Sequence, residues 1–246
     1  MLNVTARLEL ISKIVDTLGI VVEDARFDFE EDGLHVRVVD PSHVAMVKLD
    51  VDAAAFETWE LDETKVGFDI RKLKELLSLG GANDLIEFSY GEETGVLTIN
   101  LGKIDRNIRP LDNSTMNPPA VPTLDFPCKA VIGGAEFSQA LRAARQVGDL
   151  VNFSLSQDSF TIHVQGSADS VTVVFDKDEL QLLECKEPAR SQYSLSYLVP
   201  MAKVFGALDS VSLGFGDNFP LSMTFSFNDG AAEVQYFLAP RVESDI

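Results

Sequence analysis

The stretch from Arg109 to Pro127 constrains the fold of this chain more than any other. It reads RPLDNSTMNPPAVPTLDFP and contains half of the chain's 10 prolines. Proline fixes its own φ, lacks an amide donor and biases the preceding residue toward extended geometry. We therefore predict neither helix nor central strand here, but a semi-rigid extended connector.

The sequences on the two sides of this connector resemble each other. FDFEED at Phe27–Asp32 matches FSLSQD at Phe153–Asp158, and IEFSYG at Ile86–Gly91 matches VSLGFG at Val211–Gly216 with nearly the same spacing. An internal repeat indicates a repeated architecture.

The repeat predicts an α+β fold made of two similar domains, each with two helices packed on antiparallel sheet. We expect domains at 1–111 and 128–246, joined by the connector at 112–127. Apolar residues at helical spacing predict four helices. The first carries Leu10, Ile11, Ile14, Val15 and Leu18, and the other three cover Ile70–Leu79, Glu136–Val147 and Leu198–Leu208. Alternating segments bounded by turn residues predict strands at Leu2–Ala6, Arg26–Glu30, Leu34–Val39, Val44–Val51, Leu85–Tyr90, Val96–Leu101, Ile104–Arg109, Lys129–Ile132, Val151–Leu155, Phe160–Val164, Val171–Phe175, Val211–Phe215, Met223–Phe227 and Ala232–Leu238.

The chain is strongly acidic, with a formal net charge of −19 and a pI of about 4.4. Ordinary nucleic-acid-binding domains are basic, so the acidity instead fits a solvated surface, basic partners or a high-salt cytoplasm. No run of 18 apolar residues predicts a membrane span, and the N-terminus does not resemble a secretion signal. With only two cysteines, we expect a reducing cytoplasmic interior.

Motifs that would indicate catalysis are missing from the sequence. There is no P-loop, GxGxxG, GxSxG or HExxH motif, and the two cysteines lack the CxxC spacing of a zinc site. His35, His43 and His163 lie on or beside predicted strands, where we interpret them as surface residues. The sequence therefore disfavours an enzyme and predicts no catalytic residue, no metal and no cofactor.

Three short segments carry a family resemblance. They are DPSHV at Asp40–Val44, the Val121-Pro122 pair in the connector, and LAPR at Leu238–Arg241. Together they resemble the archaeal and eukaryotic sliding clamps, the proliferating cell nuclear antigen (PCNA) family, and the resemblance extends over the whole chain. It implies a DNA clamp fold, in which a homotrimer closes a ring around duplex DNA with the helices on the inner wall and the sheets outside.

The resemblance also implies a function in the archaeal cell interior, on chromosomal DNA. The ring would tether DNA polymerase, flap endonuclease and DNA ligase through a short peptide motif for processive replication and repair. An ATP-dependent clamp loader would open it, and the ring itself would have no active site.

Basic residues on the predicted helices are the candidate DNA contacts. They are Lys13, Arg71, Lys72, Lys74, Arg142, Arg145 and Lys203, of which Lys13, Arg142 and Lys203 match family positions that face DNA. Glu75, Ser78 and Gln139 stand where relatives often carry a base. The surrounding acidity should repel DNA elsewhere, which favours threading over side-on adsorption.

Two further sets of residues follow from the resemblance and from the sheet edges. The partner-peptide groove is expected at His43, Val44, Met46, Val121, Pro122, Pro220, Phe237, Leu238, Ala239, Pro240 and Val242. The subunit interface is expected where two free strand edges pair head to tail, at Lys103, Arg106, Arg109, Val171, Val173, Phe175 and Asp176.

Two alternatives remain open from the sequence alone. The chain would be a clamp-like subunit of a heterotrimeric ring or a scaffold that only binds partners. A hydrolase with a carboxylate site is disfavoured because no motif supports it.

Overall fold

The computed structural model describes residues 1–91 and 93–241, and it divides the chain into two compact units. The first unit contains Met1–Val121 and the hairpin segment Ser226–Val234, and the second contains Pro122–Phe225 and the chain from Gln235 onward. Among the described residues, no helix has the length and apolar character needed to cross a membrane.

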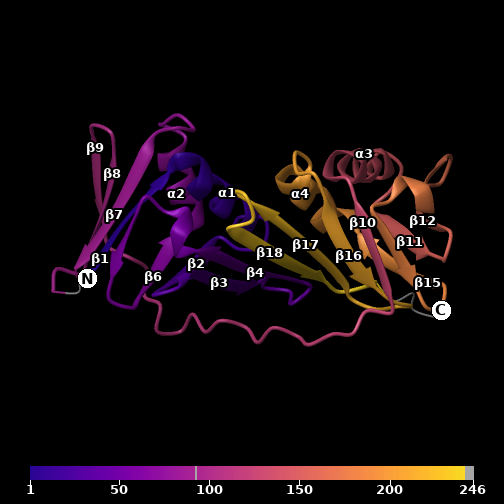
Figure 1. Cartoon of the computed structure of the whole chain (residues 1–246), viewed down its shortest axis with the longest axis horizontal. Helices are drawn as coiled ribbons and strands as arrows, with labels where there is room; N and C mark the ends of the chain where they lie inside the picture. Colours follow the sequence, from indigo (N-terminus) through magenta and orange to yellow (C-terminus); the bar gives the residue numbers. More distant parts are fainter. Residues whose placement is uncertain (92, 242–246) are drawn as a thin grey trace. The chain divides into compact units, whose positions relative to one another are not determined.

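The first unit begins with a strand and a helix and continues through two groups of strands separated by a second helix (Figure 1). In chain order the elements are β1 (Leu2–Arg7), α1 (Leu8–Leu18), β2 (Asp24–Glu30), β3 (Gly33–Val39), β4 (Ala45–Asp52), a 3-10 turn at Ala53–Ala55, β5 (Thr58–Leu61), β6 (Thr64–Asp69), α2 (Ile70–Leu77), β7 (Leu85–Gly91), β8 (Val96–Leu101) and β9 (Ile104–Ile108).

The elements after the connector repeat this order. They are β10 (Cys128–Ile132), α3 (Gly134–Arg145), β11 (Leu150–Leu155), β12 (Ser159–Gln165), β13 (Ser170–Asp176), a 3-10 turn at Lys177–Glu179, β14 (Leu182–Cys185), β15 (Ala189–Ser194), α4 (Leu195–Phe205), β16 (Val211–Phe215), β17 (Leu221–Phe227) and β18 (Ala232–Leu238). Each element of the first series therefore has a counterpart in the second, which confirms the predicted duplication of an α+β module.

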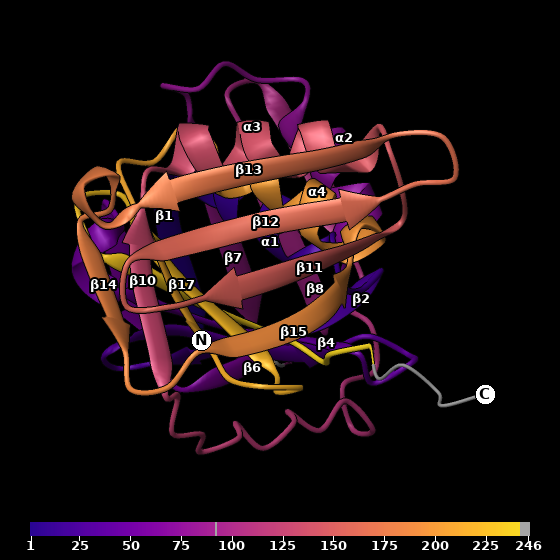
Figure 2. The same cartoon turned by 90° about the vertical axis from the view of Figure 1, so that its right-hand side faces the viewer.

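The strand pairings repeat as well. In the first unit the sheet order is β5-β1-β7-β8-β9, and a second group runs β4-β3-β2-β6. After the connector, the corresponding orders are β14-β10-β16-β17-β18 and β13-β12-β11-β15. Neighbouring strands pair antiparallel, for example with Val4 opposite Phe88 and Ala130 opposite Leu213. Figure 2 shows β13, β12, β11 and β15 side by side in this order.

The helix pair of each unit packs against the strands of that unit. In the first unit α1 lies beside α2 and contacts β1, while α2 contacts β2 and β6. In the second unit α3 lies beside α4 and contacts β12 and β13, while α4 contacts β15. The face of each helix that points away from the strands is left for solvent or a partner.

A glycine permits the close approach of α3 and α4. A Cβ on Gly134, the first residue of α3, would lie 2.2 Å from the carbonyl oxygen of Phe205, so no larger residue fits without a shift. The pair Gly133-Gly134 therefore begins a tightly packed helix. On the buried side of the helix, Phe137 stacks on Phe205 with ring centroids 5.4 Å apart.

Several helix boundaries differ from the prediction: both ends of α4 by three residues, both ends of α3 by two, and the end of α2 by two. Helix α4 begins at Leu195, three residues before the predicted start, and therefore contains Pro200 in its interior. A proline is best tolerated in the first turn, but the buried Leu195, Leu198 and Met201 stabilise the earlier start. Helix α2 ends at Leu77, and its last predicted residue, Leu79, is in a turn with 64% of its surface exposed.

Four strands, β5, β6, β14 and β15, were not predicted. β5 and β14 have only four residues each, and their half-buried or exposed side chains leave a weak alternation. β6 carries Gly67 in its interior, where glycine weakens strand preference. β15 places Ser191 and Ser194 among its buried residues, so its inward face is partly polar. Tertiary pairing rather than local preference forms such strands.

The connector has the predicted extended character. From residue 112 to residue 127 it forms no regular strand or helix, and Figure 1 shows it as an irregular trace between β9 and β10. Just before it, the amide of Leu111 donates a hydrogen bond to the Gly67 carbonyl at 2.9 Å. A Cβ on Gly67 would come within 2.6 Å of the Leu111 carbonyl oxygen. Glycine is therefore required where the connector crosses β6.

Candidate functional site

Two bases on the helices of the first unit are neutralised by acids of the same unit. Lys13 Nζ lies 2.8 Å from Glu9 Oε1, one turn earlier on α1, and Lys74 Nζ lies 2.5 Å from Asp16 Oδ1. The hydrogen bond and charge of Lys13 lower the pKa of Glu9, so the carboxylate stays ionised near neutral pH. Neither lysine offers an uncompensated charge.

The other two candidate DNA contacts of the first unit, Arg71 and Lys72, lie in the first turn of α2. Asp69 caps this helix by accepting a hydrogen bond from the Lys72 amide at 2.9 Å, and its carboxylate also lies 3.3 Å from Lys72 Nζ. Exposed Arg71 makes no ion pair within the described residues. Of the four predicted DNA contacts in this unit, only Arg71 has an unpaired charge.

The second unit has the opposite balance. Arg142 and Lys203 are exposed and form no ion pair with any described residue, although Arg142 Nε donates to the Ser138 carbonyl at 3.4 Å. Arg145 is the exception, because it pairs with Asp149 one turn later. This unit therefore presents two uncompensated bases on helices that carry one acid in the described ranges, Glu136.

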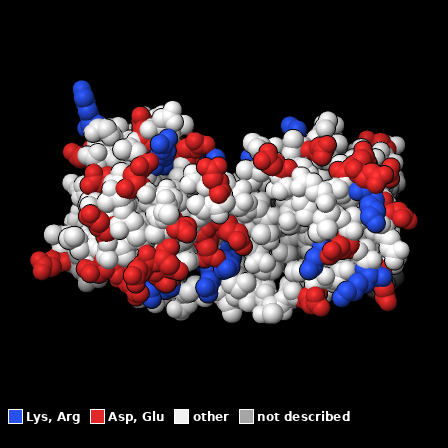
Figure 3. All heavy atoms as spheres, viewed as in Figure 1, with Lys and Arg blue, Asp and Glu red and all other residues white. Residues whose placement is uncertain are grey.

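Such bases are suited to weak contact with phosphate. Duplex DNA has one charge per roughly 1.7 Å of axis, and exposed, unpaired Arg and Lys side chains can meet these charges without breaking an internal ion pair. On the face shown in Figure 3 acidic residues are spread widely and basic residues are scattered among them. Unpaired positive charge on these helices is therefore confined to a few positions.

The edge strand β9 and the residues that flank it are basic on balance, with Lys103, Arg106 and Arg109 against one acid, Asp105, and a cavity lies beside them. Lys103, Arg106 and Arg109 form no ion pair within the described part of the chain, and Ile104 is 39% exposed. Arg106 and Arg109 line a cavity of about 310 Å³ between α2 and β9. Its other lining residues include Lys72, Leu73, Leu76, Ile99 and Ile108. An apolar floor with a basic rim can receive an apolar side chain that has acidic neighbours.

The edge strand β13 has that complementary character. Val174 is 49% exposed, and the strand ends in exposed Asp176, followed by Asp178 and Glu179. Val171 and Val173 are half-buried on the other face of the strand. Phe175 is buried within its own unit, where it stacks on Phe160 with ring centroids 6.0 Å apart.

The sequence reasoning missed the two exposed apolar residues at these edges. The predicted set includes Val171, Val173 and Phe175 on the second edge, whereas the exposed large apolar residues of these two edge strands are Val174 and Ile104. Strand alternation could have identified Val174, because residues 171, 173 and 175 point inward and Val174 therefore lies on the outer face of the strand. No pattern in the sequence indicated the apolar cavity beside β9, because its lining residues are far apart along the chain.

In the first unit, the candidate groove residues surround a rigid turn. The buried Asp40 carboxylate accepts hydrogen bonds from the amides of Val44 and Ala45, both at 2.7 Å, and of Ser42 at 3.2 Å. His43 takes a positive φ of 55° and is exposed. This explains the DPSHV sequence: the aspartate holds the turn, which presents His43 and half-buried Val44 outward.

The other groove candidates range from exposed to fully buried. Met46 is buried in the first unit and Val121 is half-buried there. In the second unit Phe237 and Leu238 are buried, Pro220, Ala239 and Pro240 are half-buried, and Pro122 is exposed. Val242 lies outside the described residues. Within each unit the buried members pack in the interior, and the half-buried and exposed members can touch a ligand.

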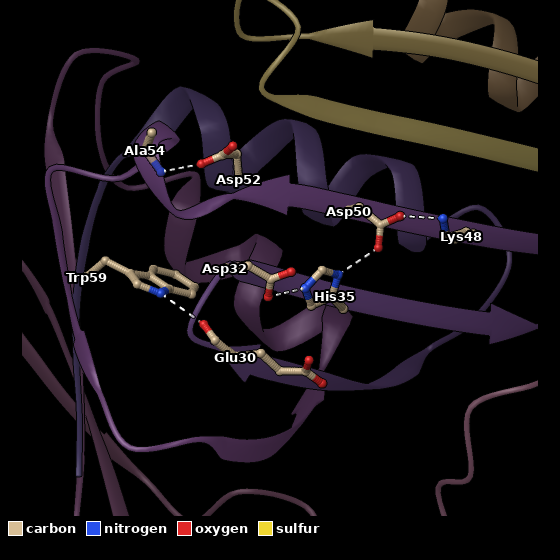
Figure 4. A network of polar contacts seen from close by, with 8 residues as sticks. All are labelled: Glu30, Asp32, His35, Lys48, Asp50, Asp52, Ala54 and Trp59. Atoms are coloured by element: carbon tan, nitrogen blue, oxygen red, sulfur yellow. Dashed lines mark hydrogen bonds and ion pairs between the residues drawn. The ribbon is translucent and has the colours of Figure 1, made fainter.

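One polar cluster in the first unit is more connected than the sequence suggested. His35, on β3, places Nδ1 2.7 Å from Asp50 Oδ1 and Nε2 3.0 Å from Asp32 Oδ1 (Figure 4). Lys48 Nζ lies 2.6 Å from the other Asp50 oxygen. Burial alone would lower the pKa of His35, but its hydrogen bonds to Asp50 and Asp32 outweigh burial and raise it.

Within the described residues this region also contains the metal-type group Glu30, Asp32 and His35, whose candidate ligand atoms lie within 4.8 Å of one another. Both ring nitrogens of His35 already have carboxylate partners. The cluster is therefore explained as an ion-paired part of the β2–β3–β4 surface. The prediction that His35 is a simple surface residue missed these pairs, because Asp50 joins only when β3 and β4 align.

Comparison with known proteins agrees with the duplicated architecture. The family model of the proliferating cell nuclear antigen N-terminal domain matches residues 2–113, and that of the C-terminal domain matches residues 120–241. The two matches together cover nearly all of the chain.

Relatives and solved structures match over the full length. The DNA polymerase sliding clamps of Methanosarcina mazei and Archaeoglobus fulgidus are 33% and 34% identical, with 100% of both chains covered. A solved structure of the C-terminal region of FEN-1 bound to A. fulgidus PCNA matches at a TM-score of 0.93 and 32% identity, again covering 100% of both chains. PCNA from Thermococcus kodakaraensis matches at a TM-score of 0.89 and 25% identity, over 98% of this chain and 100% of that one. The chain therefore belongs to the proliferating cell nuclear antigen family and acts as a DNA sliding clamp.

Proposed function

We propose that three copies of this chain close into a ring by pairing β9 of one copy with β13 of the next. The observation that carries the proposal is the complementarity of these two edges. β9 and its flanking residues offer three bases, Lys103, Arg106 and Arg109, and an apolar cavity, whereas β13 and the turn after it offer exposed Val174 with Asp176, Asp178 and Glu179. Head-to-tail pairing of unlike edges generates a closed ring when the rotation between copies permits it.

The ring is tested by its mass in solution. Light scattering after gel filtration at near-physiological salt should give three times the 26.9 kDa chain mass. The double variant Arg106→Glu/Arg109→Glu should dissociate the trimer at least ten-fold more readily, because it places like charges on both edges. Adding Asp176→Lys and Asp178→Lys should restore it, while the exposed β10 variant Lys129→Glu should leave the mass unchanged. A wild-type chain that stays monomeric across a salt series contradicts the proposal.

The ring encircles duplex DNA with its helices facing the hole. Arg71, Arg142 and Lys203 supply the unpaired positive charges, and Lys13, Lys72, Lys74 and Arg145 supply charges that are shared with neighbouring acids. Loose contact of this kind suits sliding, because tight phosphate contacts would oppose movement along DNA. Processivity then comes from topology, and the chain acts without a catalytic site, metal or cofactor of its own.

The partner site is a hydrophobic groove that receives a short peptide with apolar anchors on one helical turn. The rigid Asp40–Val44 turn presents half-buried Val44 to such a peptide. The solved complex of the A. fulgidus relative with the C-terminal region of FEN-1 supports a flap endonuclease as one partner. DNA polymerase and DNA ligase bind in the same way, and an ATP-dependent clamp loader opens the ring.

A peptide titration tests the groove separately from the ring. The probe is the C-terminal peptide of the flap endonuclease from the same cell, followed by calorimetry. Val44→Glu should weaken binding at least ten-fold, because it adds a charge to an apolar anchor site, while the trimer mass stays constant. Ser42→Ala is the matched control in the same turn. Equal peptide affinities for wild type and Val44→Glu would contradict the assignment of the peptide groove to the surface around Val44.

The proposed domain boundaries are 1–111 and 128–246, with 112–127 as the connector that carries Val121 and Pro122 of the groove. The proposed location is the cytoplasm of an archaeal cell, on chromosomal DNA. A reducing interior of this kind is consistent with two cysteines that are both free thiols.

A further inference from the structure

The two cysteines of the chain face each other across an antiparallel strand pair. Cys128 opens β10 and Cys185 ends β14, and they are direct partners in the register of these two strands. They are 57 residues apart in sequence. The four-residue strand β14 is at the end of its sheet, so this pair joins an edge strand to its inner neighbour.

The positions of the two sulfurs fit a disulfide with little movement. Their Sγ atoms lie 2.9 Å apart as free thiols. Directly opposed residues in antiparallel sheet have Cα separations of about 4.5–5.5 Å, which fall within the range of about 4.4–6.8 Å that disulfides adopt. Closing to a bond of about 2.05 Å requires the sulfurs to approach by less than about 1 Å.

The surroundings give the two thiols different access to solvent. Cys128 is buried, whereas Cys185 is half-buried. Both thiols donate to the Glu187 carbonyl oxygen, Cys185 at 2.9 Å and Cys128 at 3.4 Å. Burial, together with the neighbouring Cys185, raises the pKa of Cys128 to about 12. An oxidant from solution therefore meets Cys185 first.

We propose that Cys128 and Cys185 are a reversible disulfide site, which small-molecule disulfides oxidise and dithiols reduce. The Cys185 thiolate attacks one sulfur of the reagent, forms a mixed disulfide and releases one reagent thiolate, which takes up a proton. Cys128 then loses its proton and attacks Cys185 Sγ, releasing the second reagent thiol. Two protein thiols and one reagent disulfide thus become one protein disulfide and two reagent thiols.

The bond would fasten the point where the connector enters the second unit. The connector ends at Pro127, immediately before Cys128, and the Pro127 carbonyl accepts a hydrogen bond from the amide of Lys186 at 3.3 Å. Lys186 directly follows Cys185. The disulfide would therefore add a covalent link to one long hydrogen bond and a short edge pairing at this junction.

The test treats the full-length protein with oxidised glutathione and counts free thiols by alkylation under denaturing conditions, followed by intact mass measurement. The reduced protein should take up two alkyl groups and the oxidised protein none, and dithiothreitol should restore both. The melting temperature of the oxidised form should rise by about 5–15 °C, as expected for a disulfide that closes a long loop. Two free thiols after oxidation, or disulfide-linked dimers on a non-reducing gel, would overturn the proposal.

Two variants separate the steps. Cys128→Ala should retain one glutathione on Cys185 as a stable mixed disulfide, because the resolving thiol is missing. Cys185→Ser should show neither the adduct nor the shift in melting temperature, because the remaining thiol is buried. A stable glutathione adduct on wild-type Cys185 would show that Cys128 does not complete the exchange, and it would contradict the assignment.

Discussion

The two units share one order of elements and strand pairings, yet they differ in the ion pairing of their charged side chains and in the side chains that fill their cores. On the helices of the first unit three of four bases are paired with acids, whereas in the second unit Arg142 and Lys203 are unpaired within the described chain. The edge strand of the first unit is basic and that of the second unit ends in acids. The two units therefore share a backbone arrangement, but the charges on their helices and edge strands differ.

The cores also differ. The buried face of α1 is aliphatic, with Leu10, Ile11, Ile14 and Val15. The buried face of α3 carries Phe137, which contacts Phe153, Phe160 and Phe205. The second unit therefore concentrates its packing in a cluster of aromatic rings, and truncating its centre should leave a large cavity.

The largest expected effect tests this cluster. Phe137→Ala should destabilise the second unit by about 3–5 kcal/mol, and Phe137→Leu should cost less because it fills part of the space. Urea unfolding followed by circular dichroism should show an early transition. Fluorescence of Trp59, the one tryptophan of the chain, reports the first unit and should retain its midpoint. A common shift of both signals would show that the units do not unfold separately.

The second prediction concerns the unpaired bases. Arg142→Ala/Lys203→Ala should weaken binding of a short duplex about ten-fold at low salt. The salt dependence of log K should become less steep by roughly 0.9 for each phosphate that the variant no longer neutralises. Fluorescence anisotropy across a salt series measures both quantities, with Lys129→Ala as a control base on β10. An unchanged slope would mean that these helices do not face the duplex.

The third prediction concerns the paired bases of the first unit, which should become available to DNA, like those of the second unit, once their acidic partners are removed. Glu9→Gln/Asp16→Asn removes the acids that pair with Lys13 and Lys74, so both bases become available to phosphate. Duplex affinity in the same titration should rise about three-fold, an increment typical of weak exposed charges. Glu233→Gln, an exposed acid on β18, is the matched control and should change affinity less. Weaker binding by the double variant would refute the pairing argument.

The smallest effect concerns the His35 cluster. Because the folded-state pKa of His35 is raised, its contribution is fully present below the unfolded value near 6.5 and is lost as pH rises through the folded value. Burial would raise the pKa of Asp50, but bonds to His35 and Lys48 lower it, so that contribution is lost only in acid. His35→Gln should therefore flatten the loss of first-unit stability between about pH 6 and pH 8, by less than about 1 kcal/mol.

Melting curves followed by Trp59 fluorescence measure this profile. His163→Gln is the control, since its ring faces the Thr172 hydroxyl and not a carboxylate. A pH profile that is unchanged in His35→Gln would show that the ion pairs with Asp32 and Asp50 contribute nothing to stability.

Local patterns predicted most of the long elements and the duplication itself. The alternation of Leu85–Tyr90 and the helical spacing of Phe137, Ala140 and Leu141 require no tertiary information, because one buried face determines them. The start of α4 was misplaced because the apolar spacing was counted from Leu198, although buried Leu195 already belongs to the helix. The four-residue strands β5 and β14 form only when neighbouring strands supply their hydrogen bonds.

The candidate site was predictable in composition but not in pairing. Sequence identified Lys13 and Lys74 as bases on helices, but the ion pair of Lys74 with Asp16 joins two different helices and depends on how α1 and α2 pack. The contact of Cys128 with Cys185 likewise depends on the register of β10 and β14. Side-chain charge is visible in a sequence, whereas its neutralisation is a property of the folded chain.

The most direct test is primer extension on circular and linear DNA with the cognate polymerase and clamp loader. A ring held by topology should stimulate extension on a primed circle and lose that stimulation when the same template is cut to give free ends. Blocking those ends should restore it. Equal stimulation on circular and open linear templates would contradict encirclement, because a clamp that does not surround DNA cannot distinguish them.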